Sequence, residues 1–406
     1  MDPFPPASGS RETSDARDGV DGAASFDALV ARYRATMPIV EAQVYLDSAG
    51  LAPLSTEVSD AIADNLRLRA HGGKLGVKST LREHISSARR LAAELLRASP
   101  DEIALLHNTT EGLNVIANGV PLAPGDNILV PANEFPANVY PWMAQQARGA
   151  EIRRVPVDGG IVRARDVEAT MNARTRLLTI SHVGYVSGYR VELGELRELC
   201  RARGVHLIVD AAQSLGVVDI DVAAQGVDAL AGSGWKWLLG PAGTGLFYIS
   251  RELLPRIRTV FLGAGSMRLG ESVEAEDPED IKLTAERFEY STLDIATVCG
   301  LERALLWITK LGTERIAARV AAHVDRLRRE LPARGLELYI PGDEQPRAGI
   351  VSARPSKMSG EQLLAALYER GIHCGHWHGY VRFAPHFYTT NRDLDELLAA
   401  LAELHG

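Results

Sequence analysis

Cysteine is scarce in this sequence. Three cysteines, Cys200, Cys299 and Cys374, stand far apart among 406 residues, and no two of them form a CxxC pair. A disulfide framework or a cysteine-based zinc site needs paired or clustered cysteines, so neither is expected. The default location for such a chain is cytoplasmic.

Long apolar runs and an excess of positive charge are also missing. No stretch approaches the roughly 20 apolar residues that a transmembrane helix needs. The formal net charge is -8 and the isoelectric point is near 5.8, which argues against a general surface for nucleic acid or anionic membranes. We therefore expect a small-molecule ligand, with no nucleic acid and no membrane among the partners.

Residues 1–25 lack the charged and then apolar pattern of a signal peptide. They are rich in Pro, Ser, Gly and Asp, which predicts a disordered tail. The chain is too long for one compact core of ordinary size. We expect an N-terminal segment at 26–56 that packs on a small domain, a large domain at 57–290, and the small domain itself at 291–406.

Strand and helix patterns alternate through the middle of the chain. Such alternation predicts an α/β fold whose mostly parallel sheet is covered by helices on both faces. Helices are expected to start near residues 111, 137 and 193. The expected strands lie at 103–106, 127–130, 152–155, 176–180, 205–209 and 229–231.

The flanking regions have other patterns. Helices are predicted at 56–68 and 80–98 on either side of a loop at 72–79, GGKLGVKS. After a long helix from Leu301, the segments LELYIPG, GIVSARP and YVRFAPH indicate strands set among helices. They predict a smaller α+β domain.

An acid and an amide follow the strand at 205–209. The strand ends in Asp210, and Gln213 comes one short turn later. In open α/β sheets, ligands bind outside the carboxyl ends of the strands, so Asp210 is a candidate site residue. An isolated aspartate at this place is more often a cap or a turn residue.

A lysine follows the next strand. Ser233 ends that strand, and Lys236 stands between Trp235 and Trp237. Desolvation by aromatic neighbours would lower the pKa of the lysine, as an amine requires if it is to condense with an aldehyde at neutral pH. A lysine over an apolar surface patch is the ordinary alternative.

The order of these residues resembles a known family. The chain has strand–Asp–x–x–Gln, then Ser–Gly–x–Lys, then the turn GPAGTG. This order resembles the core of the fold type I enzymes that use pyridoxal 5'-phosphate, and most closely the class V aminotransferase family. That family includes cysteine desulfurases, kynureninase, isopenicillin epimerase-like proteins and cysteine-conjugate lyases. The resemblance covers roughly residues 45 to 400 and implies a large cofactor-binding domain with a smaller C-terminal one.

The resemblance implies three roles around the cofactor ring. Lys236 would bind the cofactor covalently and, once released, act as the general base at the substrate's α-carbon. Asp210 would keep the pyridine nitrogen protonated, which makes the ring an electron sink. Gln213 would donate a hydrogen bond to the ring oxygen.

The cofactor phosphate is expected at the turn HNTTEGL. Asn108, Thr109 and Thr110 precede a helix there, and a helix N-terminus with free amides and hydroxyls binds anions. Thr109 or Thr110 could be only an N-cap, and both roles can hold together. The resemblance adds Ser233 as a second phosphate ligand. It also implies that Thr292, in RFEYSTLD, reaches the phosphate of a neighbouring subunit, which predicts a homodimer with shared sites.

Three positions at the ring depart from the desulfurase pattern. Phe135, in PANEFPANVYPW, holds the place of a histidine that stacks on the ring, Tyr185 that of an asparagine, and Trp235 that of another histidine. Phenylalanine can stack but cannot move protons. These departures imply a different reaction at the same cofactor, with Tyr185 and Trp235 as candidate substrate-binding residues.

The C-terminal run GIHCGHWHGYVRF contains the implied substrate carboxylate ligand, Arg382. A guanidinium fits a carboxylate with two parallel hydrogen bonds. Cys374 precedes it but is not at the desulfurase nucleophile position, so a desulfurase is disfavoured. His376 and His378 lack a third ligand and predict a polar rim, with no metal.

His182 follows a strand end in the same layer of the fold. It is a candidate catalytic residue. The sequence does not decide whether its side chain faces the site or faces away from it.

The implied reaction starts at the α-carbon of an amino acid and passes through an external aldimine and a quinonoid. Aminotransferase-like and β-eliminating chemistry are both favoured, the latter on a cysteine S-conjugate of secondary metabolism, and an epimerase stays open. The non-enzyme alternative is a nucleotide-binding or regulatory protein. GPAGTG is the only phosphate-loop lookalike, and it lacks the lysine of GxxxxGK[ST], which argues against that alternative.

Overall fold

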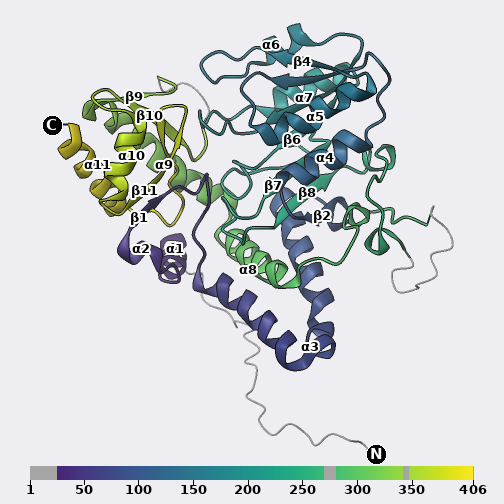
Figure 1. The fold of residues 1–406 in the computed structure, drawn as a ribbon, viewed down its shortest axis with the longest axis horizontal. Coiled ribbons are helices and arrows are strands. Elements are labelled where there is room, and N and C mark those ends of the chain that lie inside the picture. The colour runs from purple at the N-terminus through teal and green to yellow at the C-terminus, as the bar shows by residue number, and fades with distance from the viewer. Residues whose placement is uncertain (1–24, 269–279, 342–346, 406) are drawn as a thin grey trace, which may run out of the picture.

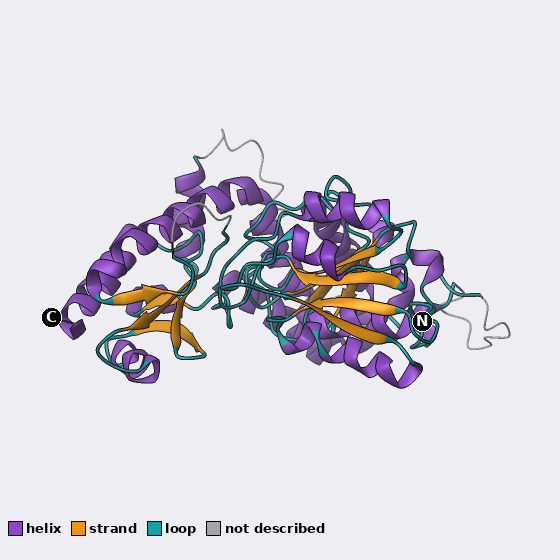
Figure 2. Ribbon diagram, turned by 90° about the horizontal axis from the view of Figure 1, so that it is seen from above, coloured by secondary structure: helices purple, strands orange, loops and turns teal. Residues whose placement is uncertain are grey.

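The computed structural model describes residues 25–268, 280–341 and 347–405 (Figure 1). Apart from its last residue, the tail expected at 1–25 lies outside the described residues. The described residues form a seven-stranded and a five-stranded sheet. Figure 2 shows the two sheets side by side, each with helices packed against it.

The large sheet has the strand order β2-β8-β7-β6-β5-β3-β4. β8 is antiparallel to both of its neighbours, and the remaining pairs are parallel. This arrangement confirms the predicted α/β fold with a mostly parallel sheet, although β8 was not among the expected strands. The strands are β2 Ile103–Leu106, β3 Asn127–Pro131, β4 Glu151–Val155, β5 Thr175–Ser181, β6 His206–Asp210, β7 Ala229–Ser233 and β8 Gly245–Ile249.

Both faces of the large sheet are buried, and β6 shows how the strands serve two cores. Leu207 and Val209 point into one hydrophobic cluster and Ile208 into the other, since successive side chains of a strand alternate between faces. Helices α3 (Thr56–Leu96), α7 (Leu193–Ala202) and α8 (Ile295–Leu311) contribute to the first cluster. Helices α4 (Thr109–Gly119) and α5 (Tyr140–Met143) contribute to the second.

The helix expected from residue 137 is much shorter than predicted. Its region contains a 3-10 turn, Pro136–Asn138, and then the four-residue α5. Each begins with a proline in its first turn, where the missing N–H costs nothing. The covering helix α6 (Ala164–Thr170) follows β4.

The loop expected at 72–79 is wrong. The backbone is helical from Thr56 to Leu96, and its one non-helical residue is Gly73, with φ 52° and ψ -137°. That conformation suits glycine and kinks the helix without ending it. The long bent helix therefore replaces the two helices and loop read from the sequence, and Figure 1 shows it projecting from the large sheet beside α8.

The small sheet has the order β1-β11-β12-β10-β9. β1, from the start of the chain, pairs in parallel with β11, so the two ends of the sequence meet in one sheet. The strands are β1 Val44–Leu46, β9 Leu336–Leu338, β10 Val351–Pro355, β11 Ile372–Trp377 and β12 Tyr380–Phe383. The helices around it are α1 Phe26–Arg34, α2 Ile39–Ala42, α9 Thr313–Glu330, α10 Gly360–Tyr368 and α11 Asn391–His405.

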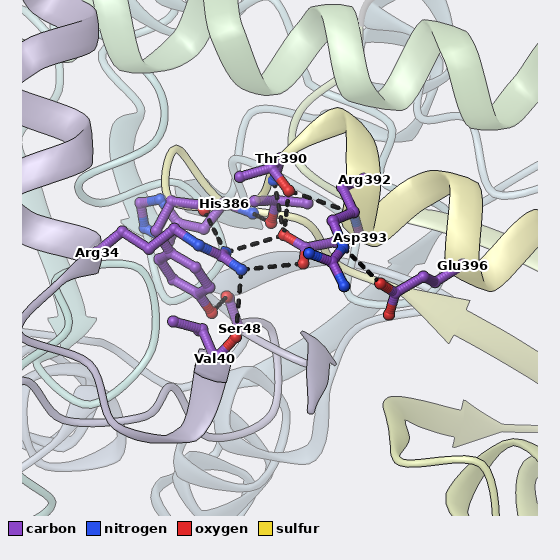
Figure 3. A network of polar contacts seen from close by, with 10 residues as sticks. Arg34, Val40, Ser48, His386, Thr390, Arg392, Asp393 and Glu396 are labelled. Atoms are coloured by element: carbon purple, nitrogen blue, oxygen red, sulfur yellow. Dashed lines mark hydrogen bonds and ion pairs between the residues drawn. The ribbon is translucent and has the colours of Figure 1, made fainter. Parts of the chain in front are cut away.

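A partly buried ion pair joins α1 to the start of α11 (Figure 3). The guanidinium of Arg34 donates to both carboxylate oxygens of Asp393, at 2.8 and 3.0 Å, and to the carbonyl of Tyr388 at 2.8 Å. Two parallel hydrogen bonds between charged groups are among the stronger polar contacts. The contact fixes the N-terminal helix α1 against the C-terminal helix α11. The domain boundaries expected from the sequence stay a prediction. No helix in the described part of the chain is long and apolar enough to cross a membrane.

Candidate active site

A cavity of about 280 Å³ lies where the carboxyl ends of β6 and β7 face the small sheet. Predicted site residues from distant parts of the sequence line it together: Asn108, Thr109, Thr110, Phe135, Tyr185, Asp210, Gln213, Ser233, Trp235, Lys236 and Arg382. The segment after β1 adds Ala49 and Gly50, and β11 adds Trp377. Two predicted residues, His182 and Thr292, do not line it.

Asp210 and Lys236 are two ionisable residues that line the cavity and influence each other's charge. Asp210 ends β6, and its carboxylate accepts a hydrogen bond from the Ala212 amide at 2.8 Å. Burial raises the pKa of Asp210, and the charge of Lys236 opposes that rise. Burial likewise lowers the pKa of Lys236, against the charge of Asp210. The lysine is therefore pushed toward the neutral amine, and an ionised Asp210 needs a positive partner in this cavity.

The two tryptophans beside Lys236 have different surroundings. Trp235 lines the cavity, whereas Trp237 is fully buried and donates from its indole nitrogen to Gln213 Oε1 at 2.8 Å. Trp235 therefore borders the cavity beside Lys236, whereas Trp237 is a core residue. Gln213 also donates to the carbonyl of Ala49 at 3.0 Å, which leaves one amide hydrogen for a ligand.

The start of α4 lines one end of the cavity with groups suited to an anion. Asn108 is the N-cap and accepts from the Glu111 amide at 2.9 Å. The hydroxyls of Thr109 and Ser233 lie 2.7 Å apart, beside the free amides of the first helical turn. A Cβ at Gly245 of β8 would stand 2.9 Å from the Asn108 backbone, so only glycine lets the strand approach this closely.

Arg382 reaches the cavity from β12. The residue is 3% exposed, and it forms an ion pair with Asp47 at 3.1 Å and donates to the carbonyl of Tyr185 at 3.0 Å. Its Nε has no hydrogen-bond partner among the described residues, which leaves a donor for a ligand. Sequence reasoning missed Asp47, although it follows a strand end in VYLDSAG as Asp210 does in its own segment.

Three aromatic rings form one wall of the cavity. Phe135 lies 5.2 Å from Tyr185 and 5.9 Å from Trp377, between ring centroids, and Tyr185 lies 5.3 Å from Trp377. The Lys236 ammonium is 5.8 Å from the centre of the Phe135 ring. Trp377 was missed as a wall residue because the sequence indicated only a polar rim around it.

The neighbouring histidines lie at the edge of this wall. β11 ends at Trp377, so His378 is one residue beyond the strand, with a positive φ of 52°. His378 Nε2 lies 3.2 Å from the Tyr185 hydroxyl, and His376 Nε2 lies 3.4 Å from a Glu361 carboxylate. Among the residues described, no cluster of His, Cys, Asp and Glu could hold a metal ion.

His182 and Thr292 occupy other places. His182 is 2% exposed and follows β5, and burial lowers its pKa to about 3, so its ring is neutral. Its catalytic role stays a prediction. Thr292 is exposed, just before α8.

A larger hollow of about 510 Å³ opens at the opposite end of the parallel strands of the large sheet. Arg201, His206, Asp228 and Arg256 are among its lining residues, and none of the predicted site residues borders it. Because β6 enters the sheet there, this hollow lies at the wrong end of the parallel strands for the chemistry at Asp210.

The cavity's groups fit pyridoxal 5'-phosphate. Thr109, Ser233 and the start of α4 suit its phosphate, and Lys236 suits its aldehyde. Asp210 suits the pyridine nitrogen, and Phe135 offers an aromatic face to the ring.

Comparisons with known proteins point the same way. The sequence profile of the family described as Aminotransferase class-V matches residues 44–397. A probable cysteine desulfurase of Methanothermobacter thermautotrophicus is 31% identical over 399 residues, which are 92% of this chain and 97% of the relative.

Two solved structures are similar in fold. One is a C-DES mutant with glycine covalently linked to its pyridoxal phosphate cofactor; it has a TM-score of 0.85 and 25% identity over 91% of this chain and 99% of the other. The other is the cystine C–S lyase C-DES with its product cysteine persulfide, with a TM-score of 0.84 and 26% identity over 90% and 99%.

Proposed function

This chain belongs to the class V aminotransferase family of pyridoxal phosphate enzymes, and we propose that it breaks a carbon–sulfur bond by β-elimination. The proposed substrate is a cysteine S-conjugate, an amino acid whose sulfur carries a bulky organic group. Elimination would release the free thiol and leave an enamine, which one water molecule hydrolyses to pyruvate and ammonia.

The observation that carries this proposal is the burial of every cysteine. Cys200, Cys299 and Cys374 are 2%, 4% and 0% exposed, and the chain has no others. Burial raises the pKa of Cys200 to about 12 and raises that of Cys374 further. A thiol held neutral and covered cannot take sulfur from a substrate as a persulfide, so the sulfur is expected to leave with its organic group.

The cavity residues have separate tasks in this reaction. The cofactor, when bound, supplies an electron sink for the substrate's α-carbon. Lys236 takes the α-proton, Asp210 supports positive charge at the ring nitrogen, and Arg382 holds the substrate carboxylate. The thiolate then leaves the β-carbon beside the wall of Tyr185 and Trp377, where an aromatic or apolar group finds contact area.

An assay with four substrates tests the proposal. S-phenylcysteine, S-methylcysteine, free cysteine, and an amino acid with a keto-acid acceptor are offered separately, while thiol, pyruvate, sulfide and exchanged amino groups are measured. We expect pyruvate and thiol in equal amounts from S-phenylcysteine, faster than from S-methylcysteine. Amino-group exchange without thiol release would replace β-elimination with transamination. Persulfide on Cys374 would restore a desulfurase.

We also propose a homodimer with shared sites. Val260, Phe261 and Leu262 are 41%, 55% and 51% exposed, a run of apolar side chains that a monomer gains nothing by exposing. Phe261 lies 5.7 Å from Tyr290 between ring centroids, so this run is close in space to the segment that carries Thr292. A partner that covers the run would bring Thr292 to a second cavity.

A further inference from the structure

Glu134 is an acidic residue beside the cavity, next in sequence to the lining residue Phe135, and none of the tasks above uses it. It precedes Phe135 in the loop after β3, and the residue is only partly exposed. Its carboxylate accepts two hydrogen bonds from one residue at the end of β5, from the Ser181 amide at 2.6 Å and from the Ser181 hydroxyl at 2.5 Å. These hydrogen bonds, which we call the clamp, attach the loop that carries Phe135 to the carboxyl end of β5.

The clamp on Ser181 lies one strand away from Asp210. β5 and β6 are parallel neighbours, and their register pairs Ser181 with Asp210. The loop after β3 thus reaches across the end of β5 toward the end of β6. It brings a second carboxylate close to the acid that faces the cofactor ring.

We propose that Glu134 is a positioning residue for the cofactor: its carboxylate fixes the Phe135 loop to the end of β5 and adds a second negative charge behind Asp210. The first effect is geometric and orders the ring that would stack on the cofactor. The second is electrostatic and favours every positive charge that forms in the cavity, on the pyridine nitrogen and on the nitrogen that Lys236 contributes.

The electrostatic effect depends on pH. Desolvation and, to a smaller extent, the negative charge of Asp210 raise the pKa of Glu134 to about 7, although the hydrogen bonds from Ser181 oppose that rise. Glu134 is therefore ionised above about pH 7 and neutral below it. The other titratable group facing it is the Tyr185 hydroxyl, and Arg154 of β4 donates to the carbonyl of Ala132 in the same loop at 2.9 Å.

Glu134→Gln separates charge from geometry. The amide oxygen can still accept from the Ser181 amide, and the amide nitrogen can donate to the Ser181 hydroxyl, so the clamp is kept while the charge is lost. The readout is the pH titration of the visible absorbance of the holoenzyme. This absorbance reports whether the nitrogen that joins Lys236 to the cofactor carries a proton. Without the negative charge, that proton is held less tightly, so we expect the midpoint to fall by about one pH unit.

A matched control is Glu102→Gln. The Glu102 carboxylate likewise accepts two hydrogen bonds, here from the backbone amides of Ser99 and Arg251, and it lies at the opposite end of the parallel strands. We expect this variant to keep the absorbance midpoint of the unchanged protein. Glu134→Ala removes clamp and charge together, and its cofactor dissociation constant is expected to rise about tenfold.

Two results would overturn the proposal. An unchanged absorbance midpoint in Glu134→Gln would remove the electrostatic role, even if that variant melted at a lower temperature. Unchanged cofactor affinity in Glu134→Ala would remove the positioning role. Neither readout needs a substrate, so the outcome is independent of whether the enzyme breaks carbon–sulfur bonds.

Discussion

Desolvation decides the chemistry of Lys236 at the scale of single residues. Its pKa is lowered mainly because the ammonium is removed from water, and the opposing charge of Asp210 keeps the amine within reach of either state. An amine that is neutral for part of the time can attack an aldehyde at neutral pH, whereas an exposed lysine rarely can.

Reduction with borohydride is expected to fix the cofactor on Lys236. The purified holoenzyme should be yellow, and peptide mapping after reduction should find the label on this lysine. Lys236→Ala should lose turnover while keeping some phosphate-anchored cofactor at Thr109 and Ser233. Lys282→Ala, which removes an ion pair with Glu286 away from the cavity, is the control and should behave as the unchanged enzyme. A label on any other lysine contradicts the assignment.

Arg382 tests the binding of the substrate carboxylate. Arg382→Lys keeps the charge but loses the planar fork, so it cannot reproduce the contacts to Asp47 and the Tyr185 carbonyl and still offer a donor to a carboxylate. Losing one charge-assisted contact costs about 1.5–3 kcal/mol, so KM should rise about ten- to a hundredfold.

The control for that change is Arg354→Lys, in a surface ion pair with Glu337 on the neighbouring strand β9. Exposed pairs contribute little, so its kinetics should match those of the unchanged enzyme. If Arg382→Lys lowered kcat and left KM unchanged, Arg382 would act on the reacting atoms instead of the carboxylate.

The sequence could predict Asp210 and Lys236 because Asp210 ends a buried strand and Lys236 comes shortly after the next one, and the carboxyl ends of parallel strands lie on the same side of a sheet. It could not predict Asp47 or Trp377 as neighbours of Arg382, because they come from β1 and β11 and meet only when the small sheet forms. Glu134 was missed for a similar reason. Its partner Ser181 is 47 residues away, and no local pattern marks the pair.

Individual strands and helices differ in how far their own residues determine their structure. The central strands of the large sheet, such as β6, are buried on both faces, so the sequence located them closely. The β8 strand was missed because its GLFYI run follows a glycine-rich turn. Helix α3 shows the opposite case. GGKLGVKS has the composition of a loop, yet the chain stays helical through it, with a kink at Gly73.

A pair of adjacent glycines tests the kink in α3. Gly73 has φ 52°, and Gly72 does not have a positive φ; a Cβ at either position would meet no atom within 4 Å. Gly73→Ala should therefore destabilise the protein by about 1–3 kcal/mol through backbone strain alone. Gly72→Ala should stabilise it by about 0.5–1 kcal/mol, since alanine favours the helix. Thermal unfolding of both variants checks this, and equal melting temperatures would contradict the kink.

At the scale of the whole molecule, the site exists because two sheets meet. The large sheet supplies the lysine, the acid and the phosphate end, and the small sheet supplies Arg382 and Trp377. Pairing of β1 with β11, together with the Arg34–Asp393 contact, holds the two ends of the chain in that small sheet (Figure 3). A change in how the sheets face each other would therefore alter substrate binding before it altered the cofactor's phosphate anchor.

The proposed dimer is tested through its exposed apolar run. Phe261→Asp places a charge in the middle of Val260–Leu262, where burial against a second copy would leave that charge desolvated and unpaired. We expect sedimentation to show a dimer for the unchanged protein and a shift toward monomer for this variant. Cofactor affinity should fall with it, because Thr292 would no longer reach the neighbouring cavity. Met143→Asp, at another exposed apolar position on α5, should stay dimeric.

An unchanged protein that sediments as a fully active monomer would refute the shared site, and a Phe261→Asp variant that stays dimeric would place the interface elsewhere.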